Sequence, residues 1–162
     1  MATLVKRSDK LAFMNVSNVY TRMTGFTALT TNKNAKEYTR QYVDEEFENT
    51  DVTGYSPSID FTFDQYIDNT VHEYLVNLIN ADTTGTGAIV TLLVVDKADE
   101  ASTDVYNAYT RTYTVVGGSE GDSMDAYTYS GTFKVKGSRT TGTATLNADE
   151  TVATFTAGGT SV

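Results

Sequence analysis

Residues 68–81, DNTVHEYLVNLINA, are the one stretch where the sequence leaves a two-residue period for a helical one. Four apolar side chains recur at the spacing of one helix face: Val71, Leu75, Leu78 and Ile79. Residues 82–87 contain two glycines and no apolar periodicity, so we predict an α-helix over about 70–81. A helix this short is marginal alone and needs a sheet to cover its apolar face.

The start of this helix carries two polar signals. Thr70 and Glu73 form a T-x-x-E pattern, which predicts a capping box that satisfies free backbone N–H groups of the first turn. His72, the single histidine of the chain, falls in the same turn. We interpret it as an exposed side chain near the cap, because no partner for a catalytic base is identifiable.

The segments on both sides of the helix have the period of strands. Residues 58–64 alternate most cleanly, with Ile59, Phe61 and Phe63 on one face and polar side chains on the other. Residues 88–96 form an apolar run that predicts a central strand. Further strands are expected over residues 19–29, 37–47, 105–116, 127–136, 139–146 and 151–156. The sequence therefore predicts a mainly β fold with one packed helix.

The length of 162 residues fits one domain. Residues 1–18 show little periodicity and predict an N-terminal arm that a neighbour would have to order. Residues 19–157 are expected to form a single β-domain, and residues 158–162 a small-residue tail.

The composition excludes several kinds of function. The chain has no cysteine, which excludes disulfides, thiolate metal sites and a Cys-His catalytic pair. A net charge of −9 argues against a protein that grips the phosphate backbone of nucleic acid. The longest apolar run is too short to span a bilayer, so we expect no membrane partner.

Charge is unevenly distributed along the chain. Residues 1–40 contain seven basic and two acidic side chains, whereas residues 41–104 contain fourteen acidic side chains and one lysine. The candidate basic partner segment consists of Lys6, Arg7, Lys10, Arg22, Lys33, Lys36 and Arg40. The candidate acidic face, directed at another subunit or a lumen, consists of Asp44, Glu45, Glu46, Asp60 and Asp64. The two segments pair either within one fold or between subunits.

A long polar segment separates the strands predicted over 37–47 and 58–64. Its ten residues are Glu48, Asn49, Thr50, Asp51, Val52, Thr53, Gly54, Tyr55, Ser56 and Pro57. Because hairpin loops normally contain about two to five residues, we expect this loop to have a role beyond closing a hairpin.

No motif for catalysis, a cofactor or a metal stands out. Two acidic groups are candidates for chemistry: Glu46 with Asp60 and Asp64 as paired carboxylates, and Glu120, Asp122, Ser123 and Asp125 as oxygen ligands for calcium. The second does not match the spacing of an EF-hand loop, and acids on solvated strands and turns usually have no such role. We therefore expect no enzymatic activity and no cofactor.

Two long stretches resemble a known family. They are YTRQYVDEEFENTDVTGYSPSIDFTFDQYIDNTVHEYLVNLIN at residues 38–80 and AYTRTYTVVGGSEGDSMDAYTYSGTFKVKG at residues 108–137. In their order of segments they resemble the major tail tube proteins of tailed bacteriophages of Gram-positive hosts and of related phage-like particles. The resemblance covers most of residues 13–137.

The resemblance implies two packed antiparallel sheets flanked by the helix, in a subunit that forms hexameric rings stacked into a hollow tube. It also implies that the loop over 48–57 and the N-terminal arm reach adjacent subunits. DNA would pass through the lumen without specific binding. The implied partners are further copies of the chain, the tape measure, tail terminator and baseplate or distal tail proteins, and a sheath protein where the tail is contractile. The implied location is the virion tail, and the host cytoplasm during assembly.

Two alternatives stay open. The chain could build the tube of a phage-derived contractile injection particle or secretion system, because the same fold serves both. It could instead be an extracellular carbohydrate-binding or immunoglobulin-like β-sandwich, whose usual marks are a secretory signal, tryptophan or a calcium site.

Overall fold

The structure, a computed structural model, describes residues 2–121 and 124–158. Strands contain 57% of the residues and helices 12%, which confirms the predicted mainly β class. In chain order the elements are η1 (Arg7–Asp9), β1 (Lys10–Val16), β2 (Val19–Arg22), β3 (Phe26–Asn32), β4 (Ala35–Arg40), β5 (Asn49–Tyr55), β6 (Ser58–Asp64), α1 (Thr70–Asn80), η2 (Gly85–Ala88), β7 (Ile89–Ser102), β8 (Val105–Glu120), β9 (Thr128–Val135), β10 (Thr140–Leu146) and β11 (Val152–Ala157).

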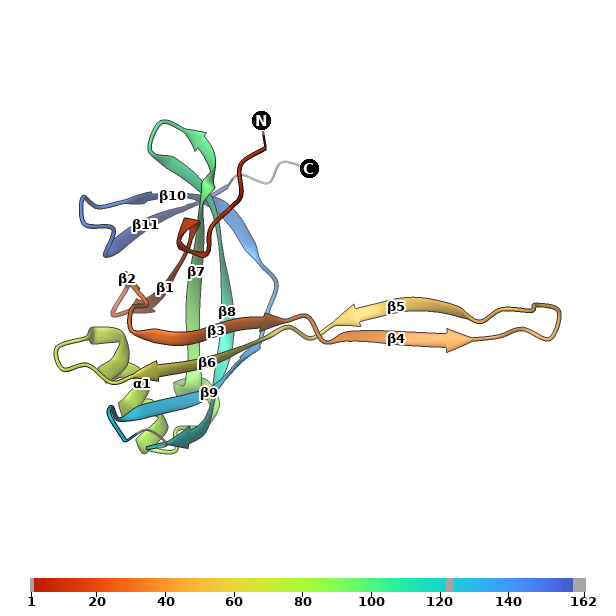
Figure 1. The fold of residues 1–162 in the computed structure, drawn as a ribbon, viewed down its shortest axis with the longest axis horizontal. Helices are drawn as coiled ribbons and strands as arrows, with labels where there is room; N and C mark the ends of the chain where they lie inside the picture. Colours follow the sequence, from red (N-terminus) through yellow and green to blue (C-terminus); the bar gives the residue numbers. More distant parts are fainter. Residues whose placement is uncertain (1, 122–123, 159–162) are drawn as a thin grey trace.

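The strands form one large antiparallel sheet and one small one (Figure 1). The large sheet has the order β10-β11-β2-β1-β7-β8-β9-β6-β3, and a further pairing between β10 and β8 closes its first six strands into a barrel. Strand β8 serves both parts of this sheet, because residues 106–110 pair with β10 and residues 113–120 pair with β9. The body is therefore barrel-like, with β9, β6 and β3 as an extension of the barrel wall.

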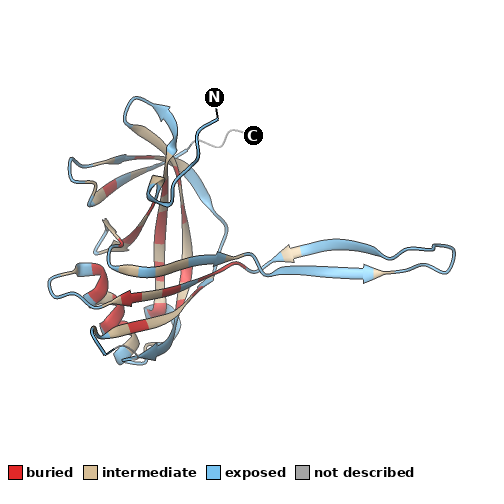
Figure 2. Ribbon diagram, in the orientation of Figure 1, coloured by how far each residue is buried: buried red, intermediate tan, exposed pale blue. Residues whose placement is uncertain are grey.

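Two apolar clusters fill the body. The larger cluster joins α1 to the sheet and contains Leu75, Phe61, Phe63 and Phe133. The smaller cluster lies among the strands of the barrel and is built from Leu11, Phe13, Leu93, Val95, Ala108, Ala144 and Ala153. The buried residues are confined to the body and are absent from β4 and β5 (Figure 2).

The expected N-terminal arm is too long, because residues 10–16 form strand β1. This strand pairs with β2 on one side and β7 on the other. Phe13 belongs to the smaller cluster and Met14 to the larger one, so both faces of β1 are buried. A strand with two buried faces lacks the polar and apolar alternation that marks a half-buried strand. The tail predicted at 158–162 lies outside the described residues from position 159 onward.

The helix lies where the sequence predicts it, and its apolar face is buried as expected. Val71 and Leu75 are fully buried, and Leu78 is nearly so. The predicted capping box is wrong, however. The N-cap is Asn69, whose side chain accepts a hydrogen bond from the His72 backbone N–H, and Thr70 is the first helical residue. Asparagine is at least as good an N-cap as threonine, so the helix begins one position earlier than a Thr70 cap requires.

The expected hairpin loop is also misplaced. Residues 49–55 of the predicted loop form strand β5, which pairs with β4 from Ala35↔Tyr55 to Arg40↔Asn49. The strand predicted over 37–47 ends at Arg40, and the turn occupies residues 41–48. Asn49, Asp51 and Gly54 have low strand propensity, but local pairing with β4 outweighs it.

Replacing Leu75 by alanine should lower the free energy of unfolding by about 2–5 kcal/mol, because the change leaves a cavity between α1 and the sheet. Glu73→Ala is the matched control, since Glu73 lies on the exposed side of the same helix and should change stability by less than about 0.5 kcal/mol. Urea unfolding followed by circular dichroism measures both. Equal effects of the two substitutions would contradict the burial of Leu75.

The corrected cap gives a second expectation. Asn69→Ala should cost about 1 kcal/mol of stability, because it removes the acceptor for the His72 N–H. Thr70→Ala should have little effect, because the exposed Thr70 side chain makes no cap hydrogen bond in the described structure. Thermal melting of the two variants distinguishes these positions, and a larger loss for Thr70→Ala would restore the original capping box.

Candidate functional site

The outstanding surface feature is a hairpin that leaves the body. Strands β4 and β5 form a two-stranded sheet of their own and project away from the barrel (Figure 1). At its base the hairpin continues the β3–β6 pair, in which Asn32 lies opposite Ser58. With about 3.4 Å per residue, strands of six and seven residues carry the turn roughly 20 Å beyond that base. We call residues 33–57 the arm hairpin and residues 41–48 its tip.

The arm hairpin exposes large apolar side chains without a core of its own. Six of them are more than half exposed: Tyr38, Tyr42, Val43, Phe47, Val52 and Tyr55. Phe47 at the tip is 78% exposed and Val43 is completely exposed. An isolated two-stranded hairpin is at best marginally stable in water, and contiguous exposed apolar surface marks interaction sites. The arm hairpin therefore has the properties of a docking element.

Local contacts stiffen this hairpin across its strands. Arg40 forms an ion pair with Asp51 and donates from Nε to the Tyr42 hydroxyl at 2.8 Å. Its guanidinium also lies over the Tyr38 and Tyr42 rings, at 5.2 and 5.5 Å from their centroids. Hydrogen bonding to Asp51 and Tyr42 raises the pKa of Arg40, which stays charged. These contacts hold the strands together where no core does.

The predicted acidic face is divided between two places. Asp44, Glu45 and Glu46 lie exposed at the tip, together with Glu48. Asp60 and Asp64 lie on β6 in the body, where Asp60 accepts hydrogen bonds from Asn32 and Thr132, and Asp64 accepts one from Thr128. The expectation of a single acidic face is therefore wrong, and so is a carboxylate pair that includes Glu46.

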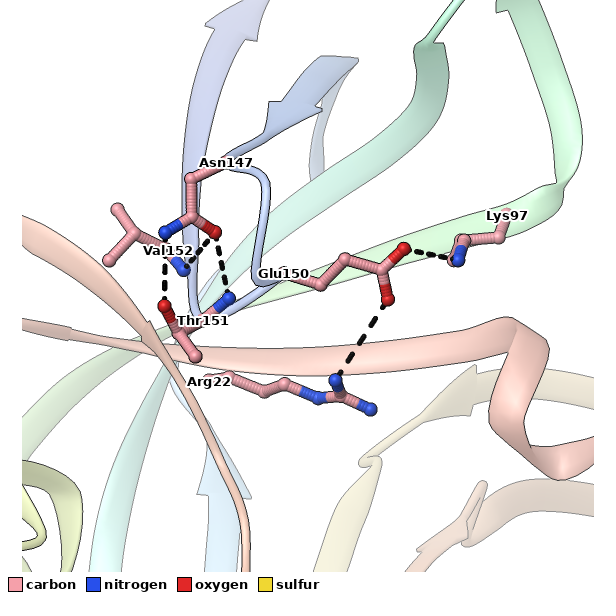
Figure 3. Close-up of polar contacts among 6 residues, drawn as sticks. All are labelled: Arg22, Lys97, Asn147, Glu150, Thr151 and Val152. Atoms are coloured by element: carbon pink, nitrogen blue, oxygen red, sulfur yellow. Dashed lines mark hydrogen bonds and ion pairs between the residues drawn. The ribbon is translucent and has the colours of Figure 1, made fainter.

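Three of the seven predicted basic partners are paired within the chain. Lys10 lies 3.3 Å from Asp96, Arg40 pairs with Asp51, and Arg22 lies 4.0 Å from Glu150. Lys97 also donates to Glu150, and this hydrogen bond raises the pKa of Lys97 (Figure 3). Within residues 2–121 and 124–158, no ion pair involves the other four, which are Lys6, Arg7, Lys33 and Lys36.

Asn147 fixes the turn that brings Glu150 to these two cations. Its side-chain oxygen accepts hydrogen bonds from the backbone N–H groups of Thr151 and Val152, at 2.8 and 3.1 Å (Figure 3). Its amide nitrogen donates to the Thr151 hydroxyl at 3.0 Å. Glu150 itself adopts a positive φ of 56° in this turn. The cluster thus ties the β10–β11 turn to β2 and β7, and its role is structural.

A cleft of about 580 Å³ opens beside strand β3. Its apolar lining comes from four strands and one connection. It includes Leu11 of β1, Met23 between β2 and β3, Leu29 of β3, Ile59 of β6, and Leu92 and Val94 of β7. Lys6, Arg7 and Lys10 also line it, so one side of the cleft is basic. These residues are far apart in the sequence, and only the folded sheet brings them together.

His72 is fully buried, so the prediction of an exposed side chain is wrong. Its Nε2 donates to the Thr24 carbonyl oxygen at 2.7 Å, and its Nδ1 accepts from the Tyr66 backbone N–H at 3.1 Å. Both ring nitrogens are thus used by the backbone, as expected for a neutral imidazole. Gly25 has a positive φ of 74°, and a Cβ there would lie 2.9 Å from the His72 ring, so the close approach of this backbone to the ring requires glycine. This arrangement is structural, because the backbone occupies both ring nitrogens of His72.

The remaining candidate for chemistry was calcium binding near residue 120. Asp122 and Ser123 lie outside the described residues. In the described part of the chain, no group of three or more His, Asp or Glu side chains is arranged to hold a metal ion.

Burial lowers the pKa of His72, against smaller opposing effects of the Thr24 hydrogen bond and the Asp64 charge. The unfolded state therefore binds a proton below about pH 6.5 before the folded state does, so stability should fall as the pH drops below that value. The loss is at most about 1.4 kcal/mol per pH unit. Urea unfolding at pH 7.5 and pH 5.5 measures it.

The control for this measurement is His72→Gln, which removes the only histidine. The variant should be less stable than the parent chain at pH 7.5 but should lose less stability between the two pH values. An equal loss in both proteins would assign the pH dependence to carboxylates instead of His72.

Comparison with known proteins does not identify the chain. No protein-family model matches the sequence, and no curated protein matches it significantly. Among the residues that the structure describes, no helix is both long and apolar enough to cross a membrane.

Proposed function

We propose that the chain is a structural subunit that assembles with copies of itself into a hollow tube, as its resemblance to phage major tail tube proteins implies. The observation that carries this proposal is the arm hairpin, a projecting element with six exposed apolar side chains and no core of its own. Burying those side chains on a neighbour would supply the stabilisation that an isolated hairpin lacks.

An open sheet edge supports association in a second direction. Within the described residues, β3 pairs only with β6, so it ends the large sheet with one unpaired edge. Such an edge is a template for pairing with a strand of another molecule. Side-by-side contacts that close on themselves give a ring, and a second contact between different surfaces gives an open filament. The hexameric ring and the stacked tube of our proposal need these two kinds of contact.

The charge of the subunit suits a tube that conducts DNA. Each copy carries a net charge of −9, so the assembled wall would be strongly acidic. A basic lumen would bind the phosphate backbone, whereas an acidic or neutral one leaves DNA hydrated and mobile. The proposal therefore includes DNA passage without specific binding, and it includes no catalytic step or cofactor. A tube for a contractile injection particle is the second candidate, because the same contacts would build it with a different cargo.

Shortening the arm hairpin should abolish tubes and leave the domain folded. Ala35 lies opposite Tyr55, so residues 36–54 can be replaced by an Asn-Gly turn that keeps the base of the hairpin. We expect long tubes of the parent protein in negative-stain electron microscopy. The shortened protein should give monomers or isolated rings, with β-rich circular dichroism unchanged, because no core residue is lost.

Serine substitutions test whether assembly depends on the apolar side chains of the tip or on exposed apolar side chains anywhere on the surface. Val43→Ser with Phe47→Ser should reduce tube formation, whereas Ile67→Ser, at a position that is 91% exposed outside the hairpin, should not. If the shortened protein still forms tubes of normal diameter, the arm hairpin has no role in assembly. If the parent protein forms no higher assembly at any concentration or salt, the proposed function itself is wrong.

A further inference from the structure

We propose that the tip of the arm hairpin of one copy inserts into the basic apolar cleft beside β3 of a second copy. This inference rests on the proposed self-assembly and adds to it the receptor surface for the hairpin. The tip is residues 41–48, and the cleft is the one lined by Leu11, Met23, Leu29, Ile59, Leu92 and Val94 with Lys6, Arg7 and Lys10 beside them.

The tip combines apolar and acidic groups in a short span. Val43 and Phe47 are exposed at its end, and Tyr42 lies at its start. Asp44, Glu45, Glu46 and Glu48 are interspersed with them, and all four are exposed. A partner for the tip therefore needs an apolar floor that takes two or three large side chains and cations beside it.

The cleft has both properties. Its volume of about 580 Å³ falls within the range of roughly 300–1,000 Å³ in which protein pockets enclose compact ligands, so it has room for a few side chains. Lys6 and Arg7 form no ion pair within the described chain, whereas Lys10 forms one with Asp96. Arg7 also donates to the Lys10 carbonyl oxygen at 3.0 Å, which holds it near the cleft. Two cations without an ion pair in the described structure thus stand beside an apolar floor, and the carboxylate in the same turn, Asp9, accepts its hydrogen bond from the Lys6 backbone N–H.

The tip cannot occupy the cleft of its own molecule. The hairpin is extended by the β4–β5 pairing and stiffened by Arg40, so its tip lies away from the barrel (Figure 1). The occupant must be a second copy, and the contact joins two different surfaces. In a row of subunits joined in this way, one end has a free tip and the other end a free cleft. Further subunits can therefore add at both ends, as an open filament requires.

Charge favours this cleft over the acidic parts of the surface of a chain whose net charge is −9. Four carboxylates at the tip repel acidic regions of a neighbour and are attracted by Lys6 and Arg7. Complementary charge mainly sets orientation and the rate of encounter, and the apolar floor supplies the burial. At physiological salt, charges are screened over about 8 Å, so only a tip that enters the cleft gains this attraction.

Exchange of charges tests the pairing. Replacing Glu45, Glu46 and Glu48 by lysine should raise the protein concentration needed for assembly about tenfold or more. Lys6→Glu with Arg7→Glu should have a similar effect. Combining both sets in one chain should recover most of the loss, because the charges are again complementary. Circular dichroism confirms that each variant is folded, which is expected because all the changed positions are exposed. Failure of the combined variant to recover assembly would overturn the pairing.

Crosslinking tests the contact directly in a chain without cysteine. Val43→Cys and Thr31→Cys, which place thiols at the tip and in the cleft lining, are introduced in separate proteins, mixed and oxidised. A disulfide-linked dimer should form between them. Val43→Cys mixed with Thr84→Cys, at an exposed position beyond α1, is the control and should give at least tenfold less product.

The outcomes separate this inference from the proposed function. Tubes that form normally without the Val43–Thr31 crosslink, or with equal crosslinking at Thr84, would overturn the cleft as receptor and leave self-assembly intact. Absence of any assembly by the parent protein would overturn both. The crosslink together with recovery by exchanged charges would establish the contact.

Discussion

Strand β7 buries both of its faces, and the rest of the body depends on this constraint. Leu92 belongs to the larger apolar cluster and Leu93 to the smaller one, so one strand anchors both cores. Its neighbour β1 does the same with Met14 and Phe13. The barrel and the helix-covered extension are thereby joined across a shared wall. A wall of this kind cannot shift on one side without disturbing the other, which gives the arm hairpin a rigid base.

The same constraint explains which elements could be predicted from the sequence. Helix α1 and strand β6 each have one buried face, so their periods of 3.6 and two residues were visible and the structure confirms both. Strand β1 has two buried faces and no alternation, so its short run of mixed residues predicts an arm instead of a strand. Strand β5 could not be predicted for the opposite reason. Neither of its faces is buried, and its Asn, Asp and Gly residues are typical of a loop.

The candidate site was predicted in part. The sequence placed an unusual polar extension between two strands near residue 50, and an extended hairpin is there. The alternation of Tyr42, Val43 and Phe47 with polar residues predicts a strand at what is the turn. The run of acidic residues between Val43 and Phe47 has low strand propensity and is the signal that indicates the turn. The cleft could not be predicted, because its lining comes from distant segments that only the sheet order brings together.

The arm hairpin has to satisfy two opposing demands. Its shape must be defined before it meets a partner, since ordering a loose segment on binding would consume part of the gain from apolar burial. Arg40 meets this demand through its contacts with Asp51, Tyr38 and Tyr42, none of which hides the tip. An exposed apolar tip must also avoid indiscriminate association. The four carboxylates around Val43 and Phe47 make contact between two tips unfavourable, and they keep the apolar groups for a surface that offers cations as well.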